Sequence, residues 1–99
     1  MRELTNIERF FLEDLSTHSP QKQGEYFFFN SYIGYKIKRF KRGRTLLQLH
    51  MNMKFEVWEV VHHKDGDKEN DDIENLCVLS REEHTSNHMA GSKWRKNWN

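Results

Sequence analysis

The sequence has only one cysteine and one proline among its 99 residues. Cys77 has no internal disulfide partner, and there is no CxxC pair to form a zinc knuckle. Long hydrophobic runs are also missing, since no apolar stretch approaches the roughly 20 residues that span a bilayer. The N-terminus shows no signal-peptide pattern. These absences argue against a disulfide-stapled or membrane protein and predict a reducing, cytoplasmic environment, with Cys77 as a small core residue.

The composition predicts one small domain, residues 1–99, with a thin core. Only 35% of the residues are hydrophobic and 31% are charged, and much of the apolar area belongs to thirteen aromatic rings (seven Phe, three Tyr and three Trp). A domain of this size often depends on a metal or a partner for stability. The net charge of +1 conceals a segregation of charge, because residues 65–74 carry six acidic side chains and residues 36–44 carry six basic ones.

The basic run 36–44 favours contact with nucleic acid, although a solvated strand face is the alternative. Cationic side chains that neutralise backbone phosphates release counterions. The candidate DNA-binding residues in this run are Lys36, Lys38, Arg39, Lys41, Arg42 and Arg44.

The first half of the chain predicts a helix followed by strands. Apolar residues recur at helical spacing over residues 6–17, after a Thr5-x-x-Glu8 capping box. The segments expected to follow are a polar connector (20–25), strands at Tyr26–Phe29 and Tyr32–Phe40, and a basic turn (Lys41–Arg44).

Residues 45–56 are the most ambiguous part of the sequence. Good helix formers dominate and predict a short helix, but alternating apolar positions also fit a strand. His50 is expected to be a surface or packing histidine.

The second half predicts a strand-loop-strand-helix unit. The expected elements are a strand at Val57–Val61 that delivers His62 and His63, a turn at Lys64–Asp67, a loop at 68–74 and a strand at Leu76–Leu79. Ser80 and Glu83 then form a second capping box. The helix that they open places His84 and His88 at i and i+4 on one face and ends at Gly91, before a basic tail, residues 92–99.

Four imidazoles within residues 62–88 predict a metal-assisted hydrolytic site. His84 and His88 can share one divalent ion, and the His62–His63 pair can supply a third ligand while its other member stays free as a base. Three imidazoles favour Zn or Ni, whereas cellular abundance favours Mg; Mn is a further candidate. The alternative is a purely structural zinc site.

The loop before the second strand carries its own candidates. Asn75 is expected to brace the loop and the segment of His63, and Asn70 to assist. Four aspartates, Asp65, Asp67, Asp71 and Asp72, invite a calcium-loop interpretation, but the closing Glu and flanking helices of an EF-hand are missing.

These residues resemble a known family. Glu59 to Lys68 (EVVHHKDGDK), Asn70, Asn75-Leu76, and Glu83-His84 with His88 are similar to the HNH endonucleases of phages and bacteria, and to the nuclease domains of DNase colicins. The resemblance is close over residues 59–88. It is weaker upstream, where Gly34–Ile37 and the region of His50 resemble the lead-in of small phage HNH proteins.

The resemblance implies an α+β fold with a ββα-metal (HNH, His-Me finger) core at 57–91, preceded by an N-terminal helix and a basic β segment within 1–56. It implies divalent-metal-dependent cleavage of DNA, with His63 as the general base and with His62, His84 and His88 as metal ligands. Asn75 takes the place of the middle Asn of the motif. Many relatives carry paired Asn where this chain has Asn70-Asp71, and the cysteine knuckles of some relatives are missing.

The sequence therefore predicts a metal-dependent DNA endonuclease with roles such as homing, packaging or restriction, acting as a monomer or a homodimer. The competing function is a DNA-binding module with a structural zinc and no cleavage. In the tail, Lys93, Arg95 and Lys96 are further candidates for phosphate contact, and Trp94 or Trp98 for base stacking.

Overall fold

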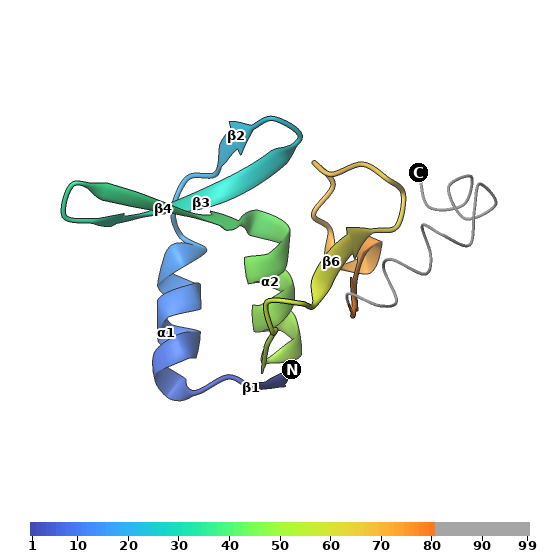
Figure 1. Cartoon of the computed structure of the whole chain (residues 1–99), viewed down its shortest axis with the longest axis horizontal. Helices are drawn as coiled ribbons and strands as arrows, with labels where there is room; N and C mark the ends of the chain where they lie inside the picture. Colours follow the sequence, from blue (N-terminus) through green and yellow to red (C-terminus); the bar gives the residue numbers. More distant parts are fainter. Residues whose placement is uncertain (81–99) are drawn as a thin grey trace.

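The computed structural model describes residues 1–80. The elements in chain order are β1 (Arg2–Glu3), α1 (Asn6–Leu15), β2 (Gln21–Gln23), β3 (Tyr26–Ile33), β4 (Lys36–Lys41), α2 (Arg42–Met51), β5 (Met53–Lys54), β6 (Val60–His63), the 3₁₀ turn η1 (Ile73–Asn75) and β7 (Leu76–Leu79). They form three small antiparallel sheets, β1-β5, β2-β3-β4 and β6-β7. Figure 1 shows the β3–β4 hairpin and the β6 strand on opposite sides of α2.

Helix α1 begins as the sequence predicts. The Thr5 hydroxyl accepts a hydrogen bond from the Glu8 amide, and the Glu8 carboxylate accepts one from the Thr5 amide. The helix ends at Leu15, two residues earlier than expected, and Ser16 and Thr17 form a turn that bonds back to it.

The sheet β2-β3-β4 differs from the expected strands in two places. The predicted connector 20–25 is wrong in part, because β2 pairs with β3 through backbone bonds that its polar side chains do not reveal. The two expected strands from Tyr26 to Phe40 form instead one long hairpin, β3 and β4, joined at Gly34 and Tyr35. Gly34 has a φ of 61°, as a two-residue hairpin turn with Gly at its first position requires.

The basic turn predicted at Lys41–Arg44 is also wrong, because α2 begins at Arg42. The helical alternative for the following segment is confirmed for residues 45–51 but is wrong for 52–56, because α2 ends at Met51 and β5 follows at Met53–Lys54. Asn52 caps the helix in the left-handed conformation (φ 57°). His50 is exposed, as expected.

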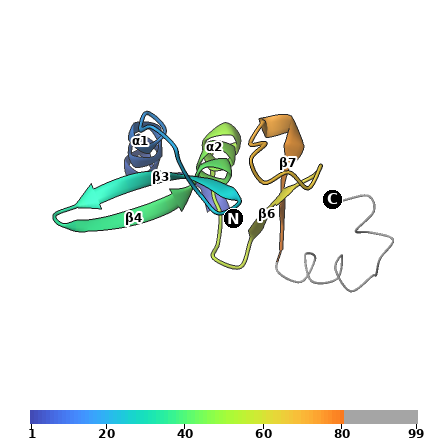
Figure 2. The ribbon, with the colours of Figure 1, turned by 90° about the horizontal axis from the view of Figure 1, so that it is seen from above.

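Helix α2 joins two small hydrophobic cores. Leu46 and Leu49 pack against the first core, which is built from Leu4, Leu12, Leu15 and Phe29, with Phe40 at its edge. Leu47 belongs to the second core, which also contains Phe55 and Leu76. Figure 2 shows α1 and α2 on the same side of the β3–β4 hairpin, with β6 and β7 beyond α2. The helix therefore fixes the hairpin relative to β6 and β7.

The strands β6 and β7 are the two strands of the expected ββα core. β7 occupies the predicted residues, whereas β6 starts at Val60 rather than Val57. Val57 and Trp58 lie in a turn and are exposed. The helix expected after Ser80 lies outside the described residues. Within residues 1–80, no helix has the length and apolar character needed to cross a membrane.

Candidate active site

Two histidines enter the site at the end of β6. In the antiparallel pair β6–β7, His62 lies opposite Cys77 and His63 opposite Leu76. Successive side chains of a strand point to opposite faces, so the two imidazoles leave the backbone in different directions. His63 is buried and His62 half-buried. Both line one cleft of about 540 Å³ between β6, the start of α2 and the start of β3.

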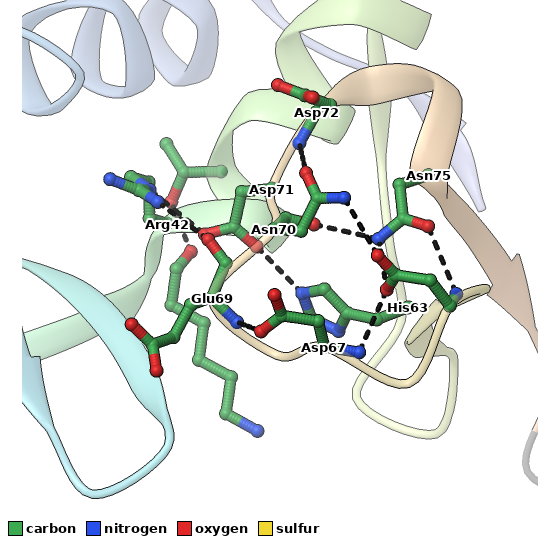
Figure 3. A network of polar contacts seen from close by, with 11 residues as sticks. Arg42, His63, Asp67, Glu69, Asn70, Asp71, Asp72 and Asn75 are labelled. Carbon is green, nitrogen blue, oxygen red and sulfur yellow. Dashed lines mark hydrogen bonds and ion pairs between the residues drawn. The ribbon is translucent and has the colours of Figure 1, made fainter. Parts of the chain in front are cut away.

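Asp71 and Arg42 hold the imidazole of His63 through two successive polar contacts. Its Nε2 lies 2.7 Å from Oδ1 of Asp71, and Oδ2 of Asp71 accepts a hydrogen bond of 2.9 Å from Nε of Arg42. Only 8% of the His63 side chain and 5% of the Asp71 side chain are exposed. Figure 3 shows Asp71 between Arg42 and His63, so that each of its oxygens faces one partner.

Arg42 is fixed by two further contacts. Its guanidinium stacks 4.2 Å from the centroid of the Phe27 ring and donates a hydrogen bond of 3.2 Å to the backbone oxygen of Glu69. The first turn of α2 is therefore tied both to β3 and to the loop that carries Asp71.

Gly43 allows the start of α2 to approach this chain of groups closely. A Cβ atom at position 43 would lie 2.6 Å from Oδ1 of Asp71 and 3.6 Å from Nε2 of His63. Only a residue without a side chain fits here unless Asp71 moves. The carboxylate therefore lies beside the N-terminal end of α2.

Asn75 closes the loop between His63 and β7. Its amide nitrogen donates to Oδ1 of Asp65 and to the backbone oxygen of Asn70, both at 2.9 Å, and its Oδ1 accepts from the Asp65 amide at 3.1 Å. The backbone oxygen of Asn75 accepts a further bond of 2.8 Å from the Lys64 amide. These contacts give Asn75 the geometry of a brace (Figure 3).

The carboxylate of Asp65 accepts further hydrogen bonds within the same loop. Hydrogen bonds from the Asn70 side chain, the Asp67 amide and the Asn75 side chain lower the pKa of its carboxyl group. The carboxylates of Asp65 and Asp67 therefore bond within the loop itself. Among residues 1–80, no three His, Cys, Asp or Glu side chains gather into a group that could hold a metal ion.

Cations surround the open part of the cleft. Lys41, Arg44 and Lys68 contribute to its lining, and the Tyr26 ring lies 4.1 Å from the Lys41 ammonium and 6.1 Å from the His63 ring. Burial lowers the pKa of Lys41, and the charges of Arg44 and Lys68 lower it further. The positive charge on this wall of the cleft attracts an anion such as a phosphodiester.

The basic run 36–44 separates into two groups. Lys36, Lys38 and Arg39 on β4 are exposed, and Lys41 is exposed along its length while its ammonium is partly covered by the Tyr26 ring. Arg42 is engaged with Asp71, and Arg44 donates to the backbone oxygens of Glu59 (2.5 Å) and Glu56 (2.6 Å). Burial lowers the pKa of Arg44. The two arginines thus have structural partners, and the exposed side chains of β4 form the accessible cationic surface.

Of the expected metal ligands, His62 lies in the cleft, whereas His84 and His88 lie outside the described residues. The tail residues Lys93, Arg95 and Lys96 also lie outside them. His62 fits a divalent ion by its chemistry, because a neutral imidazole nitrogen suits Zn, Ni and related metals. Cys77 is half-buried, and burial raises the pKa of its thiol, as a packing role predicts.

Sequence reasoning missed the contact of Asp71 with Arg42. Asp71 appears in the sequence as one of several loop carboxylates, and Arg42 as one cation in a basic run. The one signal in the sequence is Asp71 itself, which stands where many HNH proteins carry a second Asn. The partner 29 residues upstream leaves no local pattern.

Comparisons with known proteins find similar sequences among HNH endonucleases. Residues 55–86 match the HNH endonuclease family. A 30-residue segment is 53% identical to intron-associated endonuclease 3 of Enterobacteria phage RB3; it makes up 30% of this chain and 11% of that protein. The resemblance to HNH endonucleases is thereby confirmed.

A solved structure extends the likeness to most of the chain. The HNH homing endonuclease I-HmuI, from a study of its DNA binding and cleavage, matches 84% of this chain with 30% identity and a TM-score of 0.53. The expected HNH-type α+β fold is confirmed. This chain covers 44% of the length of that protein.

Proposed function

We propose that this chain, which carries the HNH endonuclease motif in residues 55–86, is a metal-dependent DNA endonuclease. The observation that carries the proposal is the buried pairing of His63 with Asp71 at the edge of a cation-lined cleft. A hydrolase for phosphodiesters needs a base beside a place where an anion can bind, and the cleft offers both.

His63 is the proposed general base. Its Nε2 is engaged by Asp71, so Nδ1 is the nitrogen left to take a proton from an attacking water. The hydrogen bonds of Asn75 keep the loop after His63 in one conformation, which holds the base at a fixed distance from the bound phosphate.

A divalent ion, when bound, would neutralise charge on the scissile phosphate and on the leaving oxygen. His62, His84 and His88 would hold it, and Mg, Mn, Zn and Ni are the candidates. Lys41 and Lys68 stand on the cleft wall, where they can bind adjacent phosphates.

The exposed cations of β4 continue from the cleft along the hairpin. Lys36 and Lys38 point to one face of β4 and Arg39 and Lys41 to the other, so both faces of the hairpin carry positive charge. We assign to them the contacts with DNA phosphates next to the cut strand. Lys93, Arg95 and Lys96 extend the proposed surface.

The test is the incubation of supercoiled plasmid with the protein and Mg, Mn, Ni or Zn. We expect nicked or linear products with at least one metal, and His63→Ala should lower the rate by about 10²- to 10⁴-fold while the circular-dichroism spectrum and metal binding stay unchanged. His50→Ala is the matched control, because this imidazole is exposed on α2.

Two outcomes contradict the proposal. If the wild-type protein binds DNA but cuts none with any metal, the chain is a binding module with a structural zinc. If His63→Ala cuts as fast as wild type, the base is another group.

A further inference from the structure

We propose that Asp71, held in place by Arg42, is a positioning residue that fixes His63, which lines the cleft, in the Nε2–H tautomer and so leaves the lone pair on Nδ1. The catalytic meaning of this assignment depends on the proposed endonuclease function. The orientation of the ring depends only on the contacts among Arg42, Asp71 and His63.

The tautomer follows from the two partners of Asp71. An ionised carboxylate only accepts hydrogen bonds, and Arg42 donates to one of its oxygens from 2.9 Å. The nitrogen of His63 that lies 2.7 Å from the other oxygen therefore carries the proton. A neutral imidazole has one protonated nitrogen, so Nδ1 keeps a free lone pair.

Asp71 differs from the other aspartates of the loop in what it contacts. Asp65 and Asp67 accept bonds from backbone amides within the loop and are exposed. Asp71 is buried, and its two partners come from β6 and α2. Bracing the loop alone would need only the bond to Arg42, whereas the second oxygen is directed at the imidazole.

Gly43 is an independent sign that this arrangement is built into the fold. The backbone of α2 comes so near to Asp71 that a Cβ atom would clash with Oδ1, the same oxygen that contacts His63. The carboxylate is therefore confined between the helix, Arg42 and the imidazole, and it has little freedom to leave the ring.

The first experiment examines the wild-type protein and uses one variant only to assign the His63 signals. Nitrogen-15 chemical shifts of the histidine rings, measured at about pH 8 where an ordinary imidazole is neutral, distinguish the two tautomers. We expect the Nε2–H pattern for His63, assigned by comparison with His63→Gln. The Nδ1–H pattern would overturn the proposal, whether or not the protein cuts DNA.

The second experiment compares Asp71→Asn with Asp72→Asn, which removes the same charge from the neighbouring exposed residue. An amide at position 71 can also donate to Nε2, which permits the wrong tautomer. We expect kcat to fall by about 10²- to 10⁴-fold with KM changed by less than about threefold, and the His63 shifts to move toward the other tautomer. Asp72→Asn should change neither.

The outcomes separate this proposal from the endonuclease function. Unchanged His63 shifts and unchanged kcat in a folded Asp71→Asn protein would refute the positioning role. If the wild type has the expected tautomer but cuts no DNA, the endonuclease function fails and the orientation of the ring stands. If Asp71→Asn does not fold, Arg42→Gln replaces it, because this change frees the carboxylate without removing it. The nitrogen-15 shifts of His63 should then move toward the other tautomer, and unchanged shifts would refute the positioning role.

Discussion

The β3–β4 hairpin and the loop between β6 and β7 satisfy their polar and charged groups in opposite ways. At the hairpin tip, Tyr35 is 94% exposed and the cations of β4 face solvent. In the loop, Asn75, Asp65 and Asn70 bond to one another, and Asp71 bonds to His63 (Figure 3). The cationic side chains of the hairpin are accessible to a binding partner, whereas the polar side chains of the loop are already hydrogen-bonded to one another.

This difference matches the two tasks that we propose. A catalytic group needs a fixed position before the substrate arrives, because reorganisation during the reaction costs rate. A surface that contacts backbone phosphates needs accessible charge more than a fixed geometry. Changes in the loop should therefore affect chemistry, and changes in the hairpin should affect binding.

Apart from changes to His63 and Asp71 themselves, the largest expected effect comes from the loss of the Asn75 hydrogen bonds that brace the loop. Asn75→Ala removes three side-chain hydrogen bonds, and its former partners are left to solvent or unpaired. We expect a decrease of about 1–3 kcal/mol in the free energy of unfolding, and a fall in cleavage rate of about 10²-fold because the base is misplaced. Urea denaturation and plasmid nicking measure the two effects.

The control for this variant is Asn6→Ala, at an exposed position in the first turn of α1. It should keep the wild-type unfolding curve and cleavage rate. A stable, fully active Asn75→Ala protein would show that the loop needs no brace.

The next effect tests the hairpin. The triple variant Lys36→Gln, Lys38→Gln and Arg39→Gln should weaken DNA binding and lower the salt slope by about 0.9 for each phosphate that is no longer neutralised. Between about 50 and 200 mM salt, the affinity of wild type should then fall by about 40-fold more than that of the variant. Fluorescence anisotropy with labelled duplex across salt concentrations gives the slope, and saturating DNA should restore the cleavage rate.

Lys22, which pairs with Glu69 at 3.1 Å, and Lys54 are exposed cations outside the hairpin, and slopes are compared per charge removed. Their replacement by Gln should leave the salt slope near the wild-type value. An equal change in slope would mean that binding follows net charge and not the hairpin.

A smaller effect is expected where the two regions meet. Gly43→Ala forces Asp71 or the helix start to move, since the new Cβ would lie 2.6 Å from Oδ1. Overpacking of this kind costs about 1–3 kcal/mol, partly offset by the better helix propensity of Ala. We expect slower cleavage, by about tenfold, at unchanged DNA affinity.

Ala at the exposed turn residue Gly24 is the comparison for this variant. Gly24 has a φ of 63°, so Ala there strains the backbone. No atom lies within 4 Å of the position that its Cβ would take, so the change does not touch the site. Gly24→Ala should lower stability but keep the rate of the folded protein. If Gly43→Ala cleaves at the wild-type rate, the close approach has no catalytic consequence.

The smallest expected effect is a loss of stability at acidic pH. The hydrogen bonds to Asp65 lower its pKa below the usual value near 3.8, so its contribution to stability is complete above that value. It disappears as the pH falls through the lowered pKa. Thermal melting between about pH 2 and pH 5 should show this decrease in wild type and a flatter dependence in Asp65→Asn. Identical curves would remove Asp65 from the acid response of the loop.

Much of the fold around the site could be predicted from the sequence, because these elements depend on local sequence patterns. The capping box of α1, the turn at Gly66 and the strand β7 all rest on residues a few positions apart. The histidine pair at the end of β6 follows from the same kind of signal.

The missed features depend on contacts across the chain. β2 consists of polar residues and forms because its backbone pairs with β3. Arg42 and Arg44 look like surface cations until the fold brings Asp71 and the backbone oxygens of Glu56 and Glu59 to them. The assignment of His84 and His88 to a metal stays a prediction.

The pairing of β1 with β5 has a consequence for the order in which the chain folds. Arg2 lies opposite Lys54, and the Leu4 amide donates to the Asn52 oxygen at 3.1 Å, so this contact closes a loop of most of the described chain. Hairpins such as β3–β4 form in about 1–10 μs, whereas contacts far apart in sequence carry a larger entropic cost and form more slowly. We expect hydrogen-exchange labelling during refolding to protect the amides of Phe29 and Phe40 before that of Leu4. The first residues of the chain would then be the last to join, after the basic β3–β4 hairpin already exists.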